Sequence, residues 1–104
     1  MKTVDLSSAN NNKSVIIDIE YAVACLKAEG GGVLKLIHPQ ITRGRVVRTH
    51  LRASLKRGGI KQMLEGEKFN SEDRISRYFC NLYSELCEDV DYNAGNSTVT
   101  FILV

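Results

Sequence analysis

Apolar residues recur along this chain with two spacings, one typical of helices and one typical of strands. Between Val15 and Leu26 they follow helical spacing, which predicts a helix that Ser14 can cap and Gly30 can end. Short apolar runs predict strands at residues 3–6, 33–37 and 98–104, with a weaker candidate at 60–64. The chain therefore combines both kinds of element, as α/β proteins do.

Two further helices follow from the same reasoning. The second is expected to run from about residue 43 or 45 to Arg57, where two glycines stop it. The third is expected after Ser71, a suitable N-cap with two acidic residues behind it. The apolar stripe of this third helix comprises Ile75, Phe79, Leu82 and Leu86.

The order of these elements predicts the fold class. A strand, a helix and a strand at this spacing predict a parallel pair of strands joined by a right-handed crossover. With 104 residues, the chain is expected to form a single domain with a modest core. We therefore expect an α/β domain in β-α-β-α-β order, with an extra helix before the last strand.

The composition indicates the cellular setting. No apolar run approaches the roughly 20 residues that a membrane span requires, and the first residues lack the apolar segment of a secretory signal. The three cysteines, Cys25, Cys80 and Cys87, have no CxxC spacing, which favours reduced thiols over disulfides or a zinc site. A cytoplasmic location without membrane contact is expected.

Charge is distributed unevenly along the chain. Between Glu29 and Glu65 there are eight basic residues and no acidic one, whereas the remainder has six basic and twelve acidic residues. The window therefore carries a formal charge of +8 and the remainder −6. A segment with this excess is suited to a negatively charged partner, of which nucleic acid is the commonest.

The second helix concentrates this charge. Its first arginines lie at the helix N-terminus, where acidic side chains are normally favoured by about 0.3–1 kcal/mol each. Further basic residues follow along one edge of the helix, beside its apolar stripe. Helix N-termini also attract phosphate through their free N–H groups. The residues expected to contact nucleic-acid phosphates are Thr42, Arg43, Gly44, Arg45, Arg48, Arg52 and Lys56. The alternative is a basic face that is merely solvated.

Asp5 and His38 are the candidate catalytic residues. They end the first and second predicted strands, and the carboxyl ends of parallel strands share one edge of a sheet. An Asp beside a His below a basic helix terminus suits general acid–base chemistry on a phosphodiester. The alternative is that His38 is a loop residue that hydrogen-bonds to the backbone.

Two segments resemble the motifs of the Smr (small MutS-related) family. Residues 4–7 (VDLS) resemble its Leu-Asp-x-His motif after the first strand, and residues 37–44 (IHPQITRG) its His-Gly-x-Gly motif after the second. Asp5 and His38 match. Three positions depart from the motifs, namely Ser7, Pro39 and Ile41. Residues 95–102 (GNSTVTFI) look like the family's glycine-flanked last strand.

The resemblance implies a fold and a range of activities. The implied fold is a two-layer α/β sandwich, similar to the C-terminal domain of translation initiation factor three. Residues 65–92 then form a helical insertion within one Smr-like domain, residues 1–104. The family binds DNA or RNA, and some members nick or cleave it. The altered motif positions favour binding over cleavage.

Two alternative functions stay open at this stage. The first is a nicking endonuclease or RNase that is metal-assisted or depends on His38. A divalent metal is expected only if the protein is such a nuclease, and no other cofactor or metal site is expected. The second is a protein-interaction module. The third helix is apolar on two sides, so it is a candidate for self-association.

Overall fold

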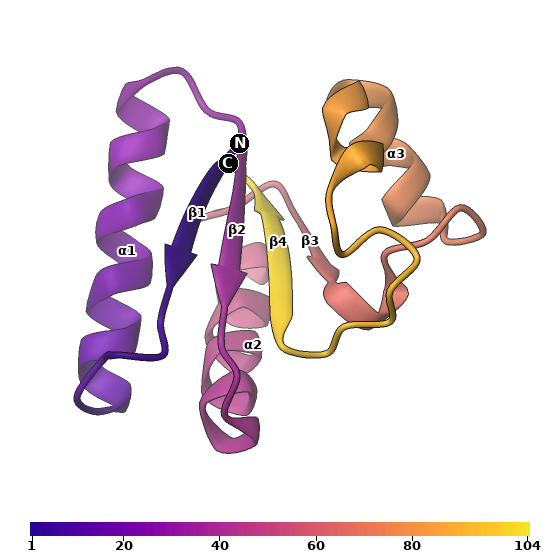
Figure 1. Cartoon of the computed structure of the whole chain (residues 1–104). Coiled ribbons are helices and arrows are strands. Elements are labelled where there is room, and N and C mark those ends of the chain that lie inside the picture. Colours follow the sequence, from indigo (N-terminus) through magenta and orange to yellow (C-terminus); the bar gives the residue numbers. More distant parts are fainter.

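The computed structural model describes the whole chain, residues 1–104. A four-stranded mixed sheet lies at the centre of the fold (Figure 1). The strands are β1 (Lys2–Asp5), β2 (Val33–Ile37), β3 (Gln62–Glu65) and β4 (Val99–Leu103). Their order is β1-β2-β4-β3, with β4 antiparallel to both of its neighbours. Since β1 is parallel to β2, the expected parallel pair is confirmed.

Three α-helices connect the strands, as predicted: α1 (Asn12–Ala28), α2 (Ile41–Lys56) and α3 (Arg74–Leu82). Each begins at a different residue from the one expected. Asn11 caps α1 by accepting a hydrogen bond from the N–H of Ser14, and Asp73 caps α3 in the same way through the N–H of Ser76. The α/β class is therefore confirmed. None of these helices combines the length and apolar character needed to cross a bilayer.

The predicted stripe of the third helix is wrong at its C-terminal end. The chain adopts an extended conformation at Tyr83, so α3 ends at Leu82 and a short 3-10 helix, Ser84–Glu88, follows. Leu82 is 48% exposed, whereas Phe79 and Leu86 are buried together against the sheet. The irregular backbone at Tyr83, which periodicity does not reveal, redirects the apolar face.

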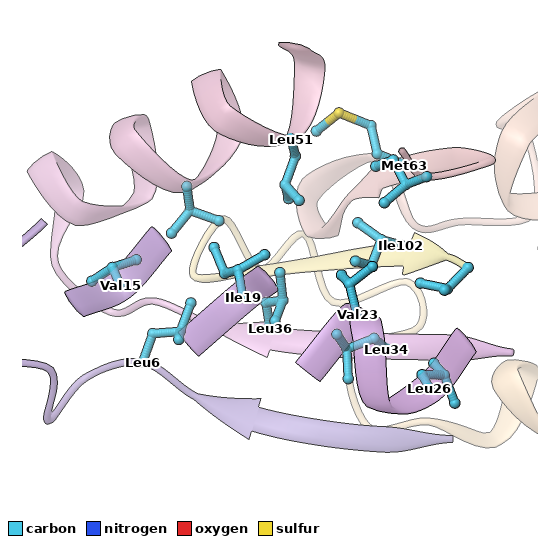
Figure 2. Close-up of a cluster of buried hydrophobic side chains, with 13 residues drawn as sticks. Leu6, Val15, Ile19, Val23, Leu26, Leu34, Leu36, Leu51, Met63 and Ile102 are labelled. Carbon is cyan, nitrogen blue, oxygen red and sulfur yellow. The ribbon is translucent and has the colours of Figure 1, made fainter. Parts of the chain in front are cut away.

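Buried side chains cover both faces of the sheet. On one face, α1 and α2 pack over a cluster that includes Leu36 and Ile102 (Figure 2). On the other face, α3 and the segments around it bury Phe69, Phe79 and Phe101. The two layers expected from the resemblance correspond to the sheet with α1 and α2. The residues after β3 add a further partial layer on the opposite face.

A buried ion-pair network connects the sheet to the partial layer formed by the residues after β3. Lys35 of β2 is buried, and its Nζ lies 2.9 Å from Asp89 and 2.6 Å from Asp91. Burial by itself lowers the pKa of Lys35, but hydrogen bonds to the two carboxylates and their charges outweigh it and raise the pKa. The segment before β4 is thereby held against the middle of the sheet.

Candidate nucleic-acid interface

An open polar groove lies where the loop after β2, the start of α2 and the residues before β4 meet. Its volume is about 400 Å³, and Ile41 is the only hydrophobic residue among the eleven that line it. The loop after β2 contributes His38 and Gln40, and α2 contributes Arg45 and Arg52. The groove is thus suited to a polar ligand rather than an apolar one.

The start of α2 opens onto this groove without an internal cap. The N-cap residue is Gln40, whose side chain makes no capping hydrogen bond, and the first turn contains no acidic residue. The first N–H groups of a helix have no acceptor within the helix, and they lie at the positive end of its dipole. Thr42, one of the residues expected to contact phosphates, lies exposed within the first turn. This helix terminus is available to an anion.

Arg48 is the centre of an internal hydrogen-bond network. Its guanidinium donates to both oxygens of Glu67, at 2.9 and 2.7 Å, and its Nε donates to Thr100 Oγ1 at 3.1 Å. Further bonds reach the carbonyl oxygens of Ser97 and Val99, both at 3.2 Å. Only 13% of the side chain is exposed. Arg48 therefore builds the wall of the groove rather than offering a free charge.

Arg45 and Arg52 are the exposed cations of the groove. No carboxylate lies within ion-pair distance of Arg45. Arg52 contacts Glu65 through one nitrogen, at 2.8 Å, but its side chain stays 58% exposed and keeps further N–H donors. Lys56 is exposed further along α2 and does not line the groove.

Two further residues expected to contact phosphate, Arg43 and Gly44, also contact other parts of the protein. Arg43 donates to the carbonyl oxygens of Leu6 and Ser7, at 3.0 and 3.2 Å, and so holds the loop after β1 against α2. Gly44 is buried against the ring of His38, and a Cβ at this position would lie 3.0 Å from Nδ1. The close approach of the imidazole therefore explains why residue 44 is a glycine.

Folding neutralises part of the basic window. Acidic residues from outside it pair with four of its eight cations: Lys35, Arg48, Arg52 and Arg57. The four cations that make no ion pair are Arg43, Arg45, Lys56 and Lys61. The charge available to a partner is therefore smaller than the sequence suggests, and within the groove it centres on Arg45.

Asp5 and His38 are not brought together. Val4 packs on the same side of the sheet as α1, so alternation along β1 directs Asp5 to the opposite face, beside Ile37. There the carboxylate accepts a hydrogen bond from the N–H of Ser7, and hydrogen bonding to the side chain and then to the backbone of Ser7 lowers the pKa of Asp5. The acid–base pair anticipated from the sequence is absent from this geometry.

His38 is a buried part of the groove wall. The side chain is 3% exposed, and its Nε2 lies 2.8 Å from Thr100 Oγ1. The backbone N–H of His38 donates to the carbonyl oxygen of Thr98. Burial lowers the pKa of His38, and the nearby charge of Arg48 lowers it further. The imidazole is therefore neutral near pH 7, and it shares Thr100 Oγ1 with Arg48.

Sequence reasoning missed the acidic and hydroxyl residues that complete the site. Glu65 and Glu67 are the first acids after the basic window, and that position was a signal for their pairing with it. Thr100 is a polar residue within an otherwise apolar strand, and this was a second signal of a residue in the site. Ser97 and Thr98, which also line the groove, carried no signal of their own.

Fold and site together define an α/β domain with a polar groove, bordered by arginines, at the carboxyl end of β2. No group of three or more His, Cys, Asp or Glu side chains is arranged to hold a metal ion. Comparison of the chain with protein-family models, with curated proteins and with solved structures returned no match.

Proposed function

We propose that this protein binds nucleic acid by contacting backbone phosphates in the groove at the start of α2. The observation that carries the proposal is the convergence of two anion-binding features at one place. The uncapped N-terminus of α2 and the side chains of Arg45 and Arg52 all border the same polar groove. Each feature by itself attracts phosphate, and together they match a charged polymer.

The arrangement favours the phosphate backbone over the bases. The groove is lined mostly by polar side chains, it contains no Phe, Tyr or Trp, and its imidazole, His38, is buried. Stacking on aromatic side chains, which supports the binding of single strands by many proteins, is therefore not expected here. Affinity for phosphate releases counterions, so binding is expected to be salt-dependent and largely independent of sequence.

The proposal does not extend to cleavage. General acid–base catalysis needs groups that reach the same reacting atoms, and Asp5 lies on the other face of the sheet from His38. The resemblance to the Smr family points to nucleic acid as well, and membership of that family stays a prediction.

Fluorescence anisotropy with labelled single- and double-stranded DNA and RNA tests the proposal. We expect binding at low salt that weakens steeply as salt rises, and a Kd at least about tenfold higher when Arg45 and Arg52 are both changed to Glu. Arg48 is left intact because its side chain supports the fold.

The matched control changes both Lys27 and Lys61 to Glu, which reverses the same number of exposed charges at the opposite end of the sheet. This control is expected to lose much less affinity than the variant with Arg45 and Arg52 changed. An equal loss in both would show only a response to net charge. That result, or no binding to any of the four nucleic acids at low salt, would reject the groove as the interface.

A further inference from the structure

β1 is an edge strand whose outer side has no partner. It lies at one end of the sheet order β1-β2-β4-β3 (Figure 1). The N–H of Leu6 donates to the carbonyl of Ile37, so alternate residues of this segment face β2. The N–H and C=O groups of Thr3 and Asp5 therefore point away from the sheet. Such an edge is a template for another strand.

The two edge strands differ in how one outer backbone group is satisfied. In β3, the N–H of Met63 donates to the side chain of Gln62 at 3.0 Å. β1 contains no proline, and no side chain donates to or accepts from the outward backbone groups of Thr3 and Asp5. Although β1 is short and carries the charged Lys2 and Asp5, its unpaired backbone groups can still form hydrogen bonds with a second chain.

A groove follows this open edge. Its volume is about 480 Å³, and it lies between β1 and α1, where Val4, Ala22 and Cys25 contribute to a mostly hydrophobic lining. Tyr21 stands at its border and is 73% exposed, and the neighbouring exposed Ile17 extends the apolar surface along α1. The open strand edge thus lies beside an unpartnered apolar helix surface.

We infer that a second copy of this chain occupies the edge, with the two β1 strands antiparallel and the two sheets joined into one. A twofold axis beside Val4 places Thr3 of each strand opposite Asp5 of the other. In such pairs both residues exchange N–H···O=C bonds, so every outward group of Thr3 and Asp5 is satisfied. The edge is therefore complementary to itself.

Side chains support the same register. Thr3 and Asp5 point to one face of the sheet, so the hydroxyl of one copy is positioned to donate to the carboxylate of the other. On the opposite face, the two Val4 side chains meet below α1, where the apolar groove receives them. A dimer formed in this way buries the edge and the apolar surface around Tyr21 together.

Sedimentation velocity of the whole chain over a concentration series tests the inference. We expect a monomer–dimer equilibrium, and we expect Thr3→Pro to raise its Kd by more than about tenfold. Proline removes the outward N–H of Thr3 but no hydrogen bond to β2, so the strand is expected to stay folded. Circular dichroism of the variant checks this expectation.

Tyr21→Glu provides a second disruption without any change to the strand, and Tyr78→Glu is its matched control. Tyr78 is an exposed aromatic residue of α3, the helix proposed above for self-association from its sequence. Weaker association in Thr3→Pro and Tyr21→Glu but not in Tyr78→Glu supports the edge of β1. A strict monomer at every concentration, or association weakened only by Tyr78→Glu, would overturn the inference.

Discussion

Arg48 and Glu67 form a two-pronged hydrogen-bonded ion pair, with Nη1 2.9 Å from Oε2 and Nη2 2.7 Å from Oε1. This geometry is the strongest that an arginine and a carboxylate adopt. It connects the middle of α2 to the turn after β3. Burial by itself raises the pKa of Glu67, but the hydrogen bond and charge of Arg48 outweigh it and lower the pKa.

Replacing Arg48 with Ala is expected to destabilise the protein by about 2 kcal/mol. The change removes the Arg48 donors from Glu67, from the hydroxyl of Thr100 and from the carbonyl oxygens of Ser97 and Val99. Urea unfolding followed by circular dichroism measures the effect. Arg45→Ala is the control, since Arg45 makes no ion pair, and its unfolding midpoint is expected to match that of the wild type.

An unchanged midpoint for Arg48→Ala would mean that the network contributes nothing to stability, and Arg48 would again be a candidate for direct phosphate contact. The two arginines lie three residues apart on the same helix. Comparing the stability and the nucleic-acid affinity of both variants thus distinguishes an arginine that supports the groove from one that binds nucleic acid.

The secondary structure was largely predictable because the interactions that determine it are local. Helical spacing from Val15 to Leu26 and the apolar run from Val33 to Ile37 each identify one element, with little reference to the rest of the chain. The break at Tyr83 was not predictable. No proline or glycine marks it, and the residues after it continue the apolar spacing.

The individual charge pairs were not predictable, because partners far apart in the sequence meet only in the folded chain. Lys35 interrupts an apolar strand, yet its partners Asp89 and Asp91 lie more than fifty residues further on. Similarly, the basic helix gave no indication of which arginine meets Glu67. The position of the candidate site was therefore predicted from the sequence, whereas the roles of its individual arginines required the structure.

The buried imidazole of His38 predicts a stability change near neutral pH. Burial and the charge of Arg48 lower its pKa from 6.5, so the folded state holds it neutral while the unfolded state gains a proton as the pH falls. The contribution of His38 is thus fully present above pH 6.5 and is lost as the pH falls below that value. The slope from this one group cannot exceed about 1.4 kcal/mol per pH unit.

Urea unfolding of the wild type and of His38→Gln, at intervals between about pH 7.5 and 5.5, checks this effect. Glutamine has no titratable group and retains a polar atom near Thr100, so its profile is expected to be flatter. Glu67 and Asp91 also have lowered pKa values, but their ordinary values are 4.5 and 3.8, below this interval. Parallel profiles for the two proteins would contradict the assignment.

Gly44 and His38 supply the last prediction, which concerns the close packing behind the groove. Alanine in a helix interior normally gains about 1 kcal/mol over glycine. At Gly44, however, the added Cβ would lie 3.0 Å from Nδ1 of a ring that is buried and bonded to Thr100, so we expect Gly44→Ala to destabilise. In a His38→Ala background the same substitution is expected to stabilise, because the ring is gone. Thermal unfolding of the four proteins in this double-mutant cycle measures the reversal, and a destabilising effect of similar size in both backgrounds would show that another contact requires glycine.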